Sequence, residues 1–168
     1  MFDEEVLTAA RRLLATCRAR GLLLATAESC TGGLIAGALT EIPGSSDVVE
    51  RGFVTYSNEA KASMLGVPRQ MIERHGAVSA EVARAMAEGA LAHSAAHLAV
   101  SVTGVAGPGG GSAKKPVGLV HFGCATKTGP VRHMEKRFGD IGRGEVRRLS
   151  VVAALALFEE AAAAARSA

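Results

Sequence analysis

The segment LLLATAESCTGG, residues 22–33, changes from apolar to polar halfway along its length. The apolar run LLLAT, residues 22–26, predicts a buried strand, and GGLIAGALTEI, residues 32–42, predicts a helix that ends at Pro43-Gly44. The polar residues between the two elements are therefore expected to form a strand-to-helix turn: Glu28, Ser29, Cys30 and Thr31.

Helical and strand patterns alternate along the rest of the chain. Apolar spacing predicts a helix over residues 3–20, capped by Asp3 and ended by Gly21. Further helices are expected at NEAKASMLG with Asn58 as cap, at PRQMIERHG with Pro68 in its first turn, at SAEVARAMAEGALAHSA after the cap Ser79, and from Asp140 to an alanine-rich end that frays. Strands are expected at FVTYS (53–57), HLAVSVTGV (97–105), LVHFGCAT (119–126) and VRHMEKRF (131–138).

This alternation predicts an α/β domain with a largely parallel sheet, in which the hairpin of the last two strands adds an antiparallel member. Residues 107–118, GPGGGSAKKPVG, are expected to form a mobile loop because of their glycines and prolines. Three polar clusters follow predicted strands: ESCTGG, YSNEAK and TGVAGPGGG. In such sheets ligands bind beyond the carboxyl ends of the strands, so we expect one site there.

Length and composition narrow the class of protein. A chain of 168 residues fits a single domain, and apolar runs interrupted by charge predict a soluble protein without a membrane span. The acidic start, with no signal-peptide pattern, predicts a cytoplasmic protein, and the three cysteines are expected to be free. The net charge of +3 is scattered and only 4% of residues are aromatic, which favours a small anionic ligand over nucleic acid.

Ser29 is a candidate nucleophile. A serine needs a neighbouring base, and an acyl-transfer site needs N–H groups that face the developing oxyanion. Placed just before a helix, Ser29 is expected to lie beside the free amides of Thr31, Gly32 and Gly33. The structural alternative is that Ser29 or Thr31 only caps the helix, and a third option is that Cys30 is the reactive group.

Lys61 is a candidate base for Ser29. It lies three residues after Asn58, in a first helical turn whose dipole should lower the pKa of the ammonium. The alternative is a solvated surface lysine. Tyr56, the only tyrosine, could orient a ligand or support the lysine, or simply pack with its hydroxyl in water. Phosphate-loop, nucleophile-elbow and zinc-protease motifs fail at specific positions, so no metal or cofactor is expected.

Four segments together resemble the CinA C-terminal domain family: TAESCTGG, ERGFVTYSNEAK, HGAVS and SVTGVAGPGGGSAKKPVG. The resemblance covers about residues 3–160 and implies a three-layer α/β/α sandwich with a mixed sheet. Longer members carry a further N-terminal domain with a pyrophosphatase activity, which we do not expect here. Stand-alone members are nicotinamide-nucleotide amidohydrolases, so the resemblance implies conversion of nicotinamide mononucleotide to nicotinate mononucleotide and ammonia.

The resemblance also implies roles for individual residues. The family's serine and lysine pair corresponds to Ser29 and Lys61, with the motif tyrosine at Tyr56. Residues implied at the substrate are Glu28, Cys30, Thr31, Gly32, Gly33, Thr103, Gly104 and, for the phosphate, Arg147. Family members commonly form homodimers. The alternatives left open are a module that binds pyridine nucleotides without turnover and an amidase of broader specificity.

Overall fold

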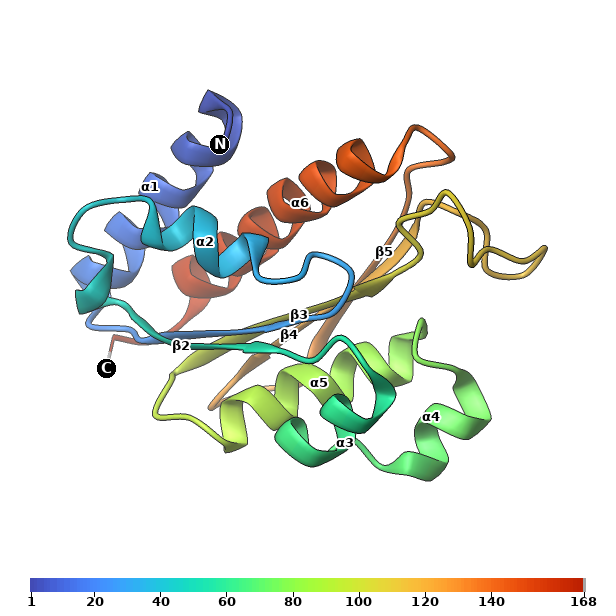
Figure 1. Cartoon of the computed structure of the whole chain (residues 1–168). Coiled ribbons are helices and arrows are strands. Elements are labelled where there is room, and N and C mark those ends of the chain that lie inside the picture. Colours follow the sequence, from blue (N-terminus) through green and yellow to red (C-terminus); the bar gives the residue numbers. More distant parts are fainter. Residues whose placement is uncertain (168) are drawn as a thin grey trace.

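The structure, a computed structural model, describes residues 1–167, and its centre is one five-stranded sheet (Figure 1). The strand order is β2-β1-β3-β4-β5. The strands are β1 (Leu24–Glu28), β2 (Val49–Val54), β3 (Leu98–Gly104), β4 (Leu119–Thr126) and β5 (Arg132–Arg137).

Strand β1 pairs in parallel with β2 on one side and with β3 on the other, and Glu28 lies opposite Val54 and Val102. The hairpin strands β4 and β5 continue the sheet with antiparallel pairing, so only β4 runs against the other four strands. The sheet is therefore mixed and largely parallel, as the sequence predicts. Because β1, β2 and β3 run in one direction, their carboxyl ends meet at the same edge of the sheet.

Helices cover both faces of the sheet and make the fold a three-layer α/β/α sandwich (Figure 1). One layer contains α1 (Glu4–Arg20), α2 (Leu34–Thr40) and α6 (Arg143–Ala164), and the other contains α3 (Asn58–Leu65), α4 (Arg69–His75) and α5 (Ala80–Ala92). A short 3-10 turn, η1 (Ser45–Asp47), precedes β2. Each layer buries its own apolar cluster against the sheet, which accounts for the helical spacing of apolar residues.

Several predicted features are confirmed. The Asp3 side chain caps α1 by accepting a hydrogen bond from the Val6 N–H at 2.9 Å, and Gly21 ends this helix in the left-handed conformation. Ser79 caps α5 in the same way through the N–H of Val82. Residues 107–118 contain no helix or strand.

Other boundaries were predicted wrongly. Strand β1 begins and ends two residues later than expected, because Glu28 still pairs with both neighbouring strands. Strand β2 covers 49–54 instead of 53–57, and the chain leaves the sheet at Thr55. Helix α6 begins at Arg143 after Gly142, not at Asp140, and continues to Ala164.

In the part of the chain that the structure describes, none of the helices combines the length and the apolar character that crossing a membrane needs.

Candidate active site

Ser29 follows β1 directly and begins the turn that leads into α2. Its N–H donates to the carbonyl of Val102 in β3 at 3.0 Å, and its own carbonyl accepts from the N–H of Gly32 at 3.0 Å. The N-cap position of α2 is Gly33, which has no side chain to cap with. Ser29 and Thr31 therefore do not occupy the capping position that the structural alternative requires.

Lys61 approaches Ser29 from the opposite helical layer. The N-cap of its helix α3 is Ser57, whose hydroxyl accepts from the N–H of Ala60 at 3.0 Å; the predicted cap, Asn58, is instead the first helical residue. The helix packs closely on α5 because Gly89 has no side chain: a Cβ atom there would lie 2.0 Å from the carbonyl oxygen of Leu65. Lys61 is only 1% exposed, which contradicts the alternative of a solvated surface lysine.

The Nζ atom of Lys61 lies 2.8 Å from Oγ of Ser29. It also donates to the carbonyl oxygens of Thr55 at 2.9 Å and Tyr56 at 3.4 Å. A neutral amine has two N–H groups and one lone pair, so the two carbonyls can take both hydrogens and leave the lone pair facing the serine hydroxyl. The geometry thus suits a neutral lysine that accepts the proton of Ser29.

Burial lowers the pKa of Lys61 from 10.5 to about 8. The predicted direction is therefore confirmed, and its main cause is the burial of the amine. A lysine with such a pKa is neutral in about a tenth of the molecules at pH 7 and in about half at pH 8, and the neutral form is the one that can act as a general base.

Cys30 is the neighbour of Ser29 and the third option for the reactive group. Burial raises the pKa of its thiol to about 11. The thiol form is the poor nucleophile of the two, so the structure disfavours chemistry at Cys30 and favours Ser29.

A cavity of about 230 Å³ opens onto Ser29 and Lys61 at the carboxyl ends of β1, β2 and β3. All three predicted polar clusters contribute to it, which confirms that the sheet brings them together. Six residues singled out in the sequence line it: Ser29, Cys30, Tyr56, Lys61, Thr103 and Gly104. Five further residues were missed, although two of them belong to the HGAVS segment: Asn58, Ala77, Val78, Ala106 and Arg143.

Four other candidates near Ser29 do not line this cavity: Glu28, Thr31, Gly32 and Gly33. The side chains of Glu28 and Thr31 are buried in the layer of α2. The N–H of Gly32 is used by the carbonyl of Ser29 and is not free for an oxyanion, contrary to the expectation. Within residues 1–167 the N–H groups of Cys30 and Thr31 donate to no carbonyl or side chain of another residue, and Cys30 directly follows the candidate nucleophile.

Arg143 and Arg147 lie one turn apart on α6, and only Arg143 lines the cavity. Arg147, the residue expected at the phosphate, donates to the carbonyls of Cys30 at 3.1 Å and Thr31 at 3.3 Å and lies behind the turn. Arg143 instead lines the cavity and donates to the carbonyl of Gly107 at 2.9 Å and to the hydroxyl of Tyr56 at 3.0 Å. The Tyr56 ring is 60% exposed, so it stands at the mouth of the cavity and is not packed in the core.

The family model of the CinA C-terminal domain matches residues 7–162, nearly the whole chain. The chain belongs to the CinA C-terminal domain family. It is 49% identical over 156 residues to nicotinamide-nucleotide amidohydrolase PncC of Escherichia coli K12, which covers 92% of this chain and 93% of the relative. It is also 54% identical over 146 residues to a CinA-like protein of Synechococcus sp. RCC307, but there the match covers 86% of this chain and 35% of the relative.

The chain spans about a third of the length of several such curated relatives of the CinA family. Solved structures of the family have the same fold. The competence/damage inducible protein CihA of Agrobacterium tumefaciens superposes with a TM-score of 0.92 at 56% identity, over 94% of this chain and 95% of that one. A CinA superfamily protein of Escherichia coli gives 0.88 at 35% identity, over 95% and 93%.

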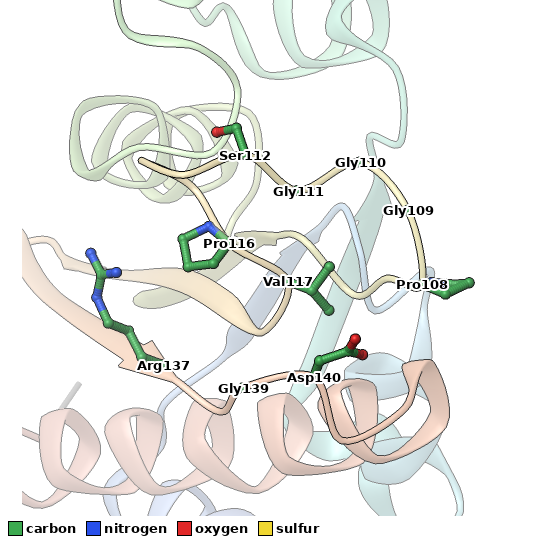
Figure 2. Close-up of a pocket in the computed structure, with 10 residues that line it drawn as sticks. All are labelled: Pro108, Gly109, Gly110, Gly111, Ser112, Pro116, Val117, Arg137, Gly139 and Asp140. Carbon is green, nitrogen blue, oxygen red and sulfur yellow. The ribbon is translucent and has the colours of Figure 1, made fainter.

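A second and larger cavity, of about 610 Å³, lies beside the glycine-rich loop of this CinA domain (Figure 2). Gly109, Gly110 and Gly111 line one side of it, and Gly139 and Asp140 line the other. Its charged side chains are Arg137 and Asp140, and Arg137 already pairs with Glu135 at 2.7 Å. Its one hydroxyl side chain, Ser112, is exposed, and among the described residues no lysine, histidine or glutamate lines the cavity beside it.

Proposed function

We propose that this CinA domain hydrolyses the carboxamide of nicotinamide mononucleotide, giving nicotinate mononucleotide and ammonia. The observation that carries the proposal is the 2.8 Å contact between Ser29 Oγ and Nζ of the buried Lys61. The relative named nicotinamide-nucleotide amidohydrolase, which matches over nearly the full length of both chains, supports the choice of substrate.

In the first half of the reaction, Lys61 accepts the hydroxyl proton of Ser29 while Oγ attacks the carboxamide carbon. The resulting oxyanion receives a hydrogen bond from the free N–H of Cys30, the residue after the nucleophile. Lys61 then returns the proton to the amide nitrogen, the carbon–nitrogen bond breaks, and ammonia leaves. The product of these steps is an ester between Ser29 and the nicotinoyl group.

In the second half, water replaces ammonia in the cavity. Lys61 takes a proton from the water, whose oxygen attacks the ester carbon, and the proton returns to Oγ of Ser29 as the ester bond breaks. Nicotinate mononucleotide is released and the serine is restored. One base thus serves both halves of the cycle, and its two carbonyl partners, Thr55 and Tyr56, hold it in place throughout.

The remaining cavity residues suit the rest of the nucleotide. Arg143 faces the cavity with a guanidinium that can bind the phosphate, a role for which it replaces Arg147. The exposed ring of Tyr56 can lie against the positively charged pyridine ring of the substrate. The described chain acts as one catalytic domain in this proposal, and a homodimer remains our prediction for its assembly.

The test is ammonia release from nicotinamide mononucleotide by the wild type and by Ser29→Ala. We expect the variant to lose at least about a thousandfold in kcat. Ser101→Ala is the matched control, because Ser101 is also a buried serine at the sheet but lies outside the cavity. Mass spectrometry of acid-quenched wild type should find the nicotinoyl nucleotide on Ser29.

Three outcomes would contradict the proposal. Normal turnover by Ser29→Ala would exclude the serine as nucleophile. Tight nucleotide binding without ammonia release by the wild type would favour the non-catalytic binding module, and equal cleavage of nicotinamide and its nucleotide would favour a broader amidase.

A further inference from the structure

Glu28 lies beside the nucleophile in sequence, yet it does not reach the cavity. It is the last residue of β1, is fully buried, and faces the start of α2. Its Oε1 atom accepts hydrogen bonds from the Thr31 hydroxyl at 3.2 Å and from the N–H of Ile35. Since the N-cap residue of α2 is a glycine without a side chain, the carboxyl of Glu28 supplies the acceptor that a capping residue would normally provide.

These two hydrogen bonds span the turn that carries Ser29. Thr31 lies within the turn and Ile35 lies in the first turn of α2, so one oxygen atom joins both to the end of β1. The backbone of Glu28 is itself fixed, because its carbonyl accepts from the N–H of Thr55 at 2.8 Å. The turn is thereby attached to the sheet on the side away from the cavity.

The second carboxyl oxygen has no such role. Among the described residues, Oε2 of Glu28 has no hydrogen-bond partner. Burial raises the pKa of this carboxyl to about 7, even though hydrogen bonds to its charged form oppose the shift. A buried carboxyl of this kind is costly, and the groups that interact with it all belong to the turn or to the first turn of α2.

We propose that Glu28 is a positioning residue, whose single accepting oxygen holds the turn of residues 29–33 so that Oγ of Ser29 stays at Nζ of Lys61. The role deepens the proposed amidohydrolase function and rests on it. It requires an acceptor at Oε1 and does not require a negative charge. Glutamine keeps such an acceptor in the same place, whereas alanine removes it.

The first readout separates kcat from KM for nicotinamide mononucleotide. We expect Glu28→Ala to lower kcat at least thirtyfold and to change KM less than threefold, because the cavity residues that would bind the substrate are untouched. Glu28→Gln should stay within threefold of the wild type in both constants. Equal losses in the two variants would overturn the proposal, because they would show that the charge matters and not the acceptor.

Ser101→Ala provides the matched control for simple loss of stability. The Ser101 hydroxyl is buried, donates to the carbonyl of Ala83 and accepts from the N–H of Gly123 at 3.1 Å, so its removal also breaks two internal hydrogen bonds. We expect this variant to melt at a lower temperature with kcat within twofold of the wild type. A loss of kcat that follows the melting temperature in both alanine variants would overturn the positioning role.

A second readout does not depend on the substrate. The rate at which a fluorophosphonate probe labels Ser29 reports whether the serine is activated, and it should fall at least tenfold in Glu28→Ala but not in Glu28→Gln. A labelled wild type that releases no ammonia would contradict the proposed function and leave this test of Glu28 valid. Equal labelling of Glu28→Ala and wild type would overturn the role, and an unlabelled, inactive wild type would overturn both proposals.

Thr31→Val covers the case in which Glu28→Ala fails to fold. It removes one of the two donors to Oε1 and keeps the size of the side chain. We expect a smaller loss of about three- to tenfold in both kcat and labelling rate. Values equal to those of the wild type would contradict the positioning role.

Discussion

The two cavities at the loop end of the molecule differ in size and in chemistry. The larger one, of about 610 Å³, is open and lined mainly by glycine, proline and exposed charges. The smaller one, of about 230 Å³, contains a buried lysine in contact with a serine. Volume alone would select the larger cavity as the candidate site. The lowered pKa of Lys61 and its contact with a serine hydroxyl select the smaller one instead.

The two cavities also differ in how much their lining residues reduce the stability of the folded chain. The larger cavity buries no charge, because its two charged side chains, Arg137 and Asp140, are both exposed to solvent. The small cavity instead requires an amine held away from water, which opposes folding whenever the amine is charged. A costly arrangement that is nevertheless present indicates where function lies.

Replacing Lys61 with methionine should produce the largest effect and should move activity and stability in opposite directions. We expect kcat to fall at least about a thousandfold, because the proposed base is lost. Since the pKa of Lys61 is about 8 in the folded chain and 10.5 otherwise, the unfolded state binds more protons between these pH values, and wild-type stability rises with pH there.

The gain in stability from Lys61→Met should therefore be largest below pH 8, at about 1–2 kcal/mol after the lost hydrogen bonds, and should vanish toward pH 10.5. Urea unfolding of both proteins at pH 7 and pH 10 measures it. A variant less stable than the wild type at both pH values would show that the buried ammonium is not a cost to the fold.

The pH profile of kcat/KM should show the next largest effect. Because the proposed reaction uses neutral Lys61, kcat/KM should fall about tenfold for each pH unit below about 8 and level off above it. Initial rates of ammonia release between pH 6 and pH 9.5 give the profile. A constant value from pH 6 to pH 8 would exclude a lysine with this pKa as the base.

Gly89→Ala in α5 should move Lys61 out of place, although Gly89 does not line the small cavity. The added Cβ would lie 2.0 Å from the carbonyl oxygen of Leu65, so α3 must move away from α5 and carry Lys61 with it. We expect a loss of about 1–3 kcal/mol in stability and about tenfold in kcat.

Gly144→Ala in α6 is the control, because its Cβ would meet nothing within 4 Å. It should stabilise the chain by up to about 1 kcal/mol and leave kcat unchanged. Unaltered activity in Gly89→Ala would show that the position of α3 tolerates this shift.

Substitutions in the larger cavity should have the smallest effect. Arg137→Ala and Asp140→Ala each remove a charged side chain that lines it without contact to Ser29 or Lys61. Kinetic constants within twofold of the wild type are expected for both. A tenfold rise in KM for either variant would extend the substrate site into the larger cavity.

Local sequence rules were enough to predict the two residues at the centre of the candidate site, which the structure places in contact. Ser29 follows an apolar run and precedes two glycines, and Lys61 lies in a first helical turn, so both were predicted from their neighbours alone. Parallel pairing then brought the two together at one edge of the sheet, as the strand order of an α/β fold requires.

The errors have physical causes that no local pattern reveals. Strand β2 lies at the edge of the sheet, and its side chains are exposed or half-buried. A prediction from the apolar run FVTYS therefore placed the strand too late in the sequence. Arg143 and Arg147 differ only by one helical turn, and only the packing of α6 decides which of them faces the cavity. Glu28 was placed at the substrate because the sequence does not show which way a strand's last side chain points.

The contact between Ser29 and Lys61 crosses from one helical layer to the other. Ser29 leads into α2 on one face of the sheet, and Lys61 comes from α3 on the opposite face (Figure 1). A small sliding of either layer would separate the two atoms while the strand ladders remain intact. Turnover should therefore depend on how the two helical layers are aligned across the sheet. Increasing concentrations of denaturant should abolish turnover before they abolish secondary structure.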